Sequence, residues 1–410
     1  MSGTVSYLGN KLTTGTGAGI NLDAWGKQKV VEDYSLLHSL FTYSVPVANY
    51  RELFNSVERT SFVNATSVNG KLNIVAGATL NDETQLKSFK HPRYEPNRGH
   101  IYSVSAFLPS PTAAGQRDFG LFTTESGLFF RLKSDGKLYG VRRTTTSGGG
   151  TVDAEEEITI PFPFDFEKGN TYDIQFQWRG VGNVKFYVGD AATGLSTLVH
   201  EMKLLNTLTE LSVFNPALPI GFACKNLGDN VVFECGCVDV SSEGGKNYDG
   251  TYGSISTSTN SGSVAITGFN APVIAVHSKE IFLGHVNTRD ILNLSLTAYS
   301  DQKSVVRVWI TRDSTAITLG TQSYIDYRDG NLEYVEYDPG AGTPMTFDKT
   351  KAELQFNSRI AQDIPFPTDA VFNKAASLNI TPGDYIIFTI HRESGTAANV
   401  GLTYEFSEEI

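Results

Sequence analysis

The stretch YDIQFQW at residues 172–178 decides the fold class, because its side chains alternate strictly between apolar and polar. Aromatic or aliphatic residues occupy every second position, and Asp or Gln stands between them. A period of two residues predicts a half-buried β-strand. The next residues, RGVGN at 179–183 and VKFYV at 184–188, predict a glycine-dependent turn and a second strand, so the whole segment is expected to form a hairpin.

Similar strands are predicted elsewhere in the chain. LNLSLTA at 292–298 alternates in the same way, while VVRVWI at 305–310 and DYIIFTI at 384–390 are typical of more deeply buried strands. Short helices are expected only at 47–54 and 200–206. Many short strands separated by turns predict an all-β protein built of sandwiches or barrels.

Composition divides the 410 residues into four parts. Residues 1–48 are expected to form an N-terminal arm, and 49–243 a β-domain. The segment GGKNYDGTYGSISTSTNSGS at 244–263 has five glycines and five serines, which is typical of a linker. The strand pattern resumes at 264–410, which we expect to form a second β-sandwich.

The arm is too short to form a core of its own. It nevertheless carries apolar side chains, among them Trp25, Tyr34, Leu36 and Leu37. These side chains are expected to gain their burial on another surface, within the subunit or on a partner. We therefore predict that the four residues are docking contacts.

The charge of the chain limits its partners. With 33 Lys and Arg against 44 Asp and Glu, the net charge is −11, which argues against broad nucleic-acid binding and against docking on an anionic membrane. The part after residue 263 is acidic, with 18 of the acidic and 11 of the basic residues. No apolar run approaches the length of a membrane span, so no membrane insertion is expected. No signal peptide is visible, and synthesis in the cytoplasm is expected.

Motifs of common enzymes are missing from the sequence. There is no phosphate-binding loop, no Gly-x-Ser-x-Gly elbow and no His-Glu-x-x-His, because Leu204 stands where the second histidine would follow His200. Glu155 and Glu157 could share one face of a strand, as the two carboxyl groups of a retaining glycosidase do. The loop-like tract before them favours a charged loop or strand edge. We predict no catalytic residue and a protein that is not an enzyme.

The three cysteines, Cys224, Cys235 and Cys237, do not indicate a disulfide scaffold. Cys235 and Cys237 are expected to point to the same side of one strand. A zinc site usually needs four ligands, and no histidine stands at a short spacing to supply the fourth. We expect buried, reduced thiols, with no metal and no cofactor.

Three segments resemble a family of tailed-bacteriophage virion structural proteins with a lectin-like (concanavalin-type) jelly roll. They are NLDAWGKQKVVEDYSLLHS at 21–39, RDFGLFTTESGLFFRLKSDGKLYGVRR at 117–143 and KGNTYDIQFQWRGVGNVKFYVGD at 168–190. In the last segment Trp178 precedes the GVG turn. The resemblance covers roughly residues 20 to 240, about half of the chain, and implies that the domain at 49–243 is a lectin-like jelly-roll sandwich.

The resemblance also implies a function. It predicts a structural component of a virion, in the tail, baseplate, fibre or capsid-associated layer, made in the host cytoplasm and assembled through protein–protein contacts. The implied partners are copies of the same chain, as a ring or trimer, and other virion proteins. Two alternatives stay open: a host-surface glycan-binding adhesin, and a polysaccharide depolymerase that uses Glu155 and Glu157.

Overall fold

The structure is a computed structural model of the 410-residue chain. It describes residues 6–8, 11–13, 19–21, 33–47, 49–59, 61–94, 98–146, 150–243, 250–257, 264–266, 271–287, 289, 291–327, 332–336, 345–360, 379–393 and 398–409.

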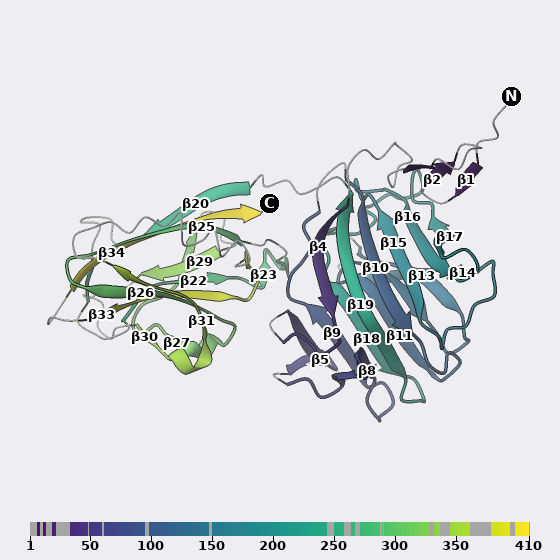
Figure 1. The fold of residues 1–410 in the computed structure, drawn as a ribbon, viewed down its shortest axis with the longest axis horizontal. Helices are drawn as coiled ribbons and strands as arrows, with labels where there is room; N and C mark the ends of the chain where they lie inside the picture. The colour runs from purple at the N-terminus through teal and green to yellow at the C-terminus, as the bar shows by residue number, and fades with distance from the viewer. Residues whose placement is uncertain are drawn as a thin grey trace. The chain divides into compact units, whose positions relative to one another are not determined.

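The chain divides into two compact units, Met1–Asn247 and Tyr248–Ile410 (Figure 1). Both are built of antiparallel strands. Within the described residues, the only helices are two 3-10 turns, η1 (Ser314–Ala316) and η2 (Lys349–Lys351). The prediction of an all-β protein made of β-sandwiches is therefore confirmed.

Two eight-stranded sheets form the sandwich of the first unit. In sheet I the order is β17 (Leu195–Met202), β16 (Val184–Asp190), β15 (Asn170–Phe176), β10 (His100–Phe107), β19 (Val232–Glu243), β8 (Lys71–Val75) and β7 (Ala65–Val68), with β4 (Asp33–Leu40) also paired to β19. In sheet II the order is β14 (Thr151–Ile158), β13 (Leu138–Thr145), β12 (Gly127–Leu132), β11 (Gly115–Phe122), β18 (Ile220–Asn226), β9 (Glu83–Ser88), β5 (Tyr50–Phe54) and β6 (Val57–Arg59).

The core of the first unit lies between the two sheets and is rich in aromatic rings. Phe119 and Phe130 of sheet II stack at 5.2 Å between ring centroids. From sheet I, Tyr172 meets Phe119 edge-on at 5.1 Å, and Phe186 meets Phe130 at 5.1 Å. All four side chains are fully buried. Such ring pairs add a geometric preference to the burial of apolar area, so they fix how the sheets face each other.

The predicted hairpin at 172–188 is present as β15 and β16. Tyr172, Ile174 and Phe176 point into the core, as their alternation predicts. The turn depends on glycine, since a Cβ atom on Gly182 would lie only 1.8 Å from the carbonyl oxygen of Gln177.

The first unit begins earlier than predicted. β4, which falls within the predicted arm, pairs with β19 over seven residues from Asp33 to Leu40. Phe41 and Val45, which follow it, belong to the core. The second half of the arm is thus part of the sandwich, because its apolar residues find burial within their own unit. Before it, the described backbone forms a small sheet of β1 (Ser6–Leu8), β2 (Lys11–Thr13) and β3 (Gly19–Asn21).

The second unit is a sandwich of two smaller sheets. One contains β20 (Gly250–Ser256), β34 (Ala398–Glu409), β25 (Ile291–Ser300) and β32 (Asn379–Ile380) in that order, with β21 (Val264–Ile266) also paired to β34. The other has the order β28 (Ile325–Tyr327), β29 (Leu332–Glu336), β22 (Ala271–Ser278), β33 (Tyr385–Arg392), β26 (Ser304–Thr311) and β31 (Glu353–Ile360). Two short hairpins complete it: β23 (Ile281–Phe282) with β24 (His285–Val286), and β27 (Ile317–Thr318) with β30 (Thr346–Phe347).

Two local predictions are wrong. The predicted linker at 244–263 contains strand β20, which pairs with β34 and buries Ile255 in the core of the second unit. The expected helices are not found in the described residues of 47–54 and 200–206. Most of 47–54 is strand β5, and 200–206 holds the last three residues of β17 followed by a turn. In both cases pairing with a distant strand outweighs local preference.

Candidate functional site

The strand β4 carries three of the four predicted docking residues. Leu37 packs against the core and Leu36 is half-buried, whereas 42% of Tyr34 is exposed. Trp25 lies outside the described residues. The structure thus places Tyr34, Leu36 and Leu37 on one strand, where only Tyr34 is largely open to solvent, and their role as docking contacts stays a prediction.

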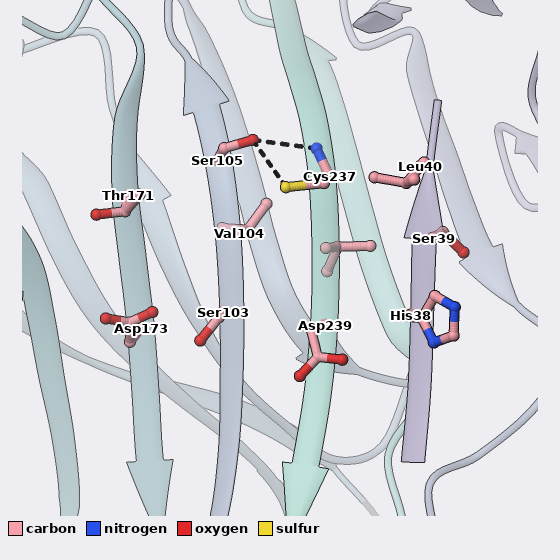
Figure 2. A pocket seen from close by; sticks show the side chains of 11 residues that line it. His38, Ser39, Leu40, Ser103, Val104, Ser105, Thr171, Asp173, Cys237 and Asp239 are labelled. Atoms are coloured by element: carbon pink, nitrogen blue, oxygen red, sulfur yellow. Dashed lines mark hydrogen bonds between the residues drawn. The ribbon is translucent and has the colours of Figure 1, made fainter. Parts of the chain in front are cut away.

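A hollow of about 300 Å³ lies beside β4 on the outer face of sheet I (Figure 2). Short side chains on neighbouring strands leave this space open. The polar residues of its lining come from β4, β10, β15 and β19 and are His38, Ser39, Ser103, Ser105, Thr171, Asp173 and Asp239.

Two carboxylates flank a hydroxyl group in this hollow. Ser103 is the direct partner of Asp173 on one side and of Asp239 on the other. Burial raises the pKa of Asp173, although hydrogen bonds from Ser196 and Ser103 act in the opposite direction. Asp239 accepts a hydrogen bond from Ser35 of β4. The surface that the hollow presents is nevertheless mostly apolar. Its carboxylates are engaged by neighbouring serines.

Cys237 also lines the hollow, and its position corrects the sequence prediction. Ser105 pairs with Cys237 and Ala106 with Cys235, so Gly236 is an extra residue, a β-bulge in β19. The bulge turns the two thiols apart. Cys235 is buried in the core, whereas Cys237 is exposed with its Sγ 3.4 Å from Ser105 Oγ.

A second polar site covers the outer face of sheet II. We call it the charged face and define it by Asp118, Arg131, Arg143, Asp153 and Glu155. Arg131 is its centre, with guanidinium nitrogens 2.6 Å from Asp118 Oδ2, 3.0 Å from Asp153 Oδ2 and 2.5 Å from Glu155 Oε1. Arg143 Nε lies 2.8 Å from Asp153 Oδ1. Five charged groups on four strands are thus joined in one network.

Burial strengthens this network. Asp118 and Arg131 are only 5% and 6% exposed. Burial raises the pKa of Asp118, and the hydrogen bonds and charge of Arg131 offset only part of that effect. Removing either partner would leave the other charged, buried and unpaired. The pair between Asp118 and Arg131 is therefore expected to be important for the stability of sheet II.

The candidate catalytic pair lies at the edge of the charged face. Glu155 and Glu157 share one side of β14, as predicted. Glu155 is paired with Arg131 and Lys133, and these contacts outweigh burial and lower the pKa of Glu155. Glu157 is paired with Lys137 at 2.8 Å. A retaining glycosidase needs one carboxyl group as an acid, and the lowered pKa of Glu155 opposes that role.

Aromatic rings lie under the cations of the charged face. The Cζ atom of Arg143 stands 5.0 Å from the ring centroid of Phe129 and 5.8 Å from that of Phe122. Arg131 stands 5.2 Å from Phe129. These rings are fully buried although they point outward, because the long cationic side chains cover them.

Two features are absent from the described parts of the chain. No group of three or more His, Cys, Asp or Glu residues there could hold a metal ion. Over the same residues, no helix has the length and apolar character needed to cross a membrane.

The chain is similar to known proteins in its structure and not detectably in its sequence. No family model matches the sequence, and no curated protein matches it. A glycosyl hydrolase family protein from Mycobacterium fortuitum has 13% identity and a TM-score of 0.36, covering 50% of this chain and 99% of its own. A beta-1,3-glucanase from Mycobacterium marinum has 12% identity and a TM-score of 0.37, covering 50% of this chain and 98% of its own.

A glycosyl hydrolase family 16 protein from Mycobacterium smegmatis is similar to the same extent, with 14% identity, a TM-score of 0.36 and coverage of 50% and 100%. These solved structures contradict the expectation that the chain is not an enzyme, and that expectation is withdrawn. The likeness assigns no activity, substrate or site residue to this chain.

The charged face was missed at the level of sequence. One signal could have revealed part of it. In RDFGLFTTESGLFFRLK, a hairpin centred on the turn at 123–126 pairs Asp118 with Arg131, as the structure shows. The contributions of Arg143 and Asp153 depend on further strand pairings that this segment does not predict.

Proposed function

We propose that this protein is a structural component of a tailed-phage virion, and that it contacts copies of itself or other virion proteins through β4. The observation that supports the proposal is an open sheet edge. β4 pairs with β19 on one side, and within the described residues no strand pairs with its other side. Such an edge presents unpaired backbone donors and acceptors that another strand can extend.

The residues around this edge add apolar surface. Leu40, at the end of β4, is 69% exposed, and beyond it Tyr43 and Val47 are 96% and 68% exposed. Their neighbours Phe41 and Val45 are buried, so the segment is anchored while its other side chains project outward. An anchored edge with exposed aromatic and aliphatic groups suits contact with a partner surface.

The test is a double substitution, Leu40→Glu with Tyr43→Glu, which changes exposed side chains and leaves the buried ones intact. We expect the wild-type chain to form a ring or trimer in light-scattering measurements and to be incorporated into particles. The double variant should lose both properties. Leu195→Glu is the control, because Leu195 is 51% exposed on the opposite edge strand, β17. Unchanged assembly and incorporation of the double variant would refute the proposal.

The hollow of Figure 2 favours a second function, binding of a host-surface glycan. Its mostly apolar surface can contact the face of a sugar ring, and its two carboxylates are the acceptors for the sugar hydroxyl groups. Asp173→Asn and Asp239→Asn should each weaken binding in a saccharide titration, whereas Asp165→Asn, on an exposed loop, should not. Equal affinity of all variants, or no saccharide bound by the wild type, would count against this function.

A further inference from the structure

Lys87, on β9, is a buried lysine beside an aromatic ring. It is only 4% exposed, and the contact that the structure gives its Nζ atom is with the ring of Phe122. Burial, followed by the charges of Arg51 and Arg143, lowers the pKa of Lys87 to about 7, while Glu83 acts weakly in the opposite direction. A lysine in this position is costly to the fold unless something outside the chain balances its charge.

Strand register places Lys87 between an arginine and a glycine. Its direct partner on β5 is Arg51, and its direct partner on β18 is Gly221. The ring of Phe122 fills the space above Gly221, where a Cβ atom would lie 2.7 Å from it. Lys87 Nζ stands 5.5 Å from the centroid of that ring. The amine is therefore bordered by an aromatic ring on one side and by an arginine on the other.

The nearby carboxylates already have partners. Arg143, whose Cζ atom stands 5.8 Å from the Phe122 ring, holds Asp153 by two hydrogen bonds. Glu58 lies 3.5 Å from Arg51. Farther along the face, Arg131 and Lys133 hold the other carboxylates. Among these cations, Lys87 is the one that forms no ion pair with the named carboxylates.

We propose that Lys87 is the centre of a binding site for an oxyanion of the carboxylate or sulfate type. The positive charges of Arg51 and Arg143 would add to the electrostatic attraction. The oxyanion would accept hydrogen bonds from the Lys87 ammonium group and lie in the positive potential of both arginines. This site is on sheet II and does not depend on the contact proposed for β4.

Proton uptake is a consequence of this arrangement. The charged and titratable groups that act on Lys87 are Arg51, Arg143 and Glu83. Because an oxyanion favours the ammonium form, its binding draws a proton onto the amine when the free protein is partly deprotonated. Affinity should therefore fall by up to about tenfold for each unit of pH above about 7.

The test is calorimetric titration of the full chain with inorganic sulfate and with glucuronate, at fixed ionic strength and several pH values. Glucose serves as the uncharged comparison. We expect both anions to bind and their affinity to weaken as the pH rises. Glucose, which carries no charge, should not bind to the Lys87 amine. Lys87→Met should abolish anion binding, and Lys225→Met, a lysine on the neighbouring strand β18, should leave it unchanged. Sulfate binding without glucuronate binding would identify an inorganic anion as the ligand.

A labelling experiment on the wild-type chain keeps the proposal testable if Lys87→Met does not fold. An amine-acylating reagent near neutral pH should modify Lys87 ahead of ordinary lysines, and sulfate should protect it several-fold. Sulfate that binds Lys87→Met as tightly as the wild type would overturn the proposal. So would a failure of both anions to bind the wild type from about pH 6 to pH 8, or the absence of protection.

Discussion

Arg131 and Asp118 face each other on neighbouring strands of sheet II and form a two-pronged ion pair. Arg131 Nε lies 2.8 Å from Asp118 Oδ1, and its Nη2 lies 2.6 Å from Oδ2. Both side chains are almost completely buried. A pair with this geometry fixes the register of β11 against β12, because a shift of one strand by two residues would leave both charges buried and unpaired.

Substitution of Asp118 should therefore be costly. We expect Asp118→Asn to lower the free energy of unfolding by about 3 kcal/mol, because it removes the charge that balances a buried guanidinium. Urea unfolding measures this change. The control is Glu157→Gln, which breaks the exposed pair with Lys137 and should cost less than about 1 kcal/mol. Equal costs for the two variants would show that the buried pair is not special.

His100 should make stability depend on pH in mildly acidic solution. It is 1% exposed, lies against Tyr94 and Phe176, and burial lowers its pKa from 6.5 to about 4. Between these values the unfolded chain binds the proton and the folded chain does not, so stability falls as the pH falls. The expected loss is about 3 kcal/mol across this window.

The matching variant is His100→Phe, which keeps an aromatic ring and removes the titration. Its unfolding free energy, measured from about pH 7 to pH 4, should decrease less steeply than that of the wild type. Parallel pH profiles would contradict the assignment to His100.

The turn of the β15–β16 hairpin should tolerate no side chain at Gly182. A methyl group there would overlap the carbonyl oxygen of Gln177, so we expect Gly182→Ala to cost at least about 2 kcal/mol in thermal or urea unfolding. Gly194→Ala is the control. Gly194 has open space around it and a φ of +67°, so its substitution should cost only about 1 kcal/mol through the backbone. A milder effect at Gly182 than at Gly194 would refute the steric argument.

Lys87 should add a second pH dependence, at alkaline pH. The pKa of Lys87 is about 7 in the folded chain, against 10.5 for an ordinary lysine. Between these values the unfolded chain binds the proton, so stability rises with pH. The full change is on the order of 5 kcal/mol without a bound anion. Lys87→Met should flatten this rise in urea unfolding, and Lys225→Met should preserve it; a Lys87→Met profile as steep as that of the wild type would contradict the shift.

The β15–β16 hairpin could be predicted from sequence because everything that defines it is local. The alternation from Tyr172 to Trp178 and the glycines of the turn lie within about twenty residues. The helix predicted at 200–206 failed for the opposite reason. Local preference there is weak, and pairing with β16 makes the segment a strand that ends at Met202.

The candidate sites could be predicted only in part. Lys87, Arg131 and Arg143 are far apart in the chain and meet through the register of several strand pairs. A sequence pattern gives the faces of each strand, but the neighbours across a sheet depend on the topology. The predicted placement of Cys235 and Cys237 on one face failed because Gly236 forms a bulge, which strict alternation does not include.

This bulge gives the chain a natural attachment point for a probe. Burial raises the pKa of the thiols of Cys224 and Cys235, and in Cys224 it reaches about 12, so both should resist alkylation. Cys237 is exposed at the edge of the hollow in Figure 2. A thiol-reactive dye should thus label each copy once, beside β4, and report on both the hollow and the open strand edge without any engineered cysteine.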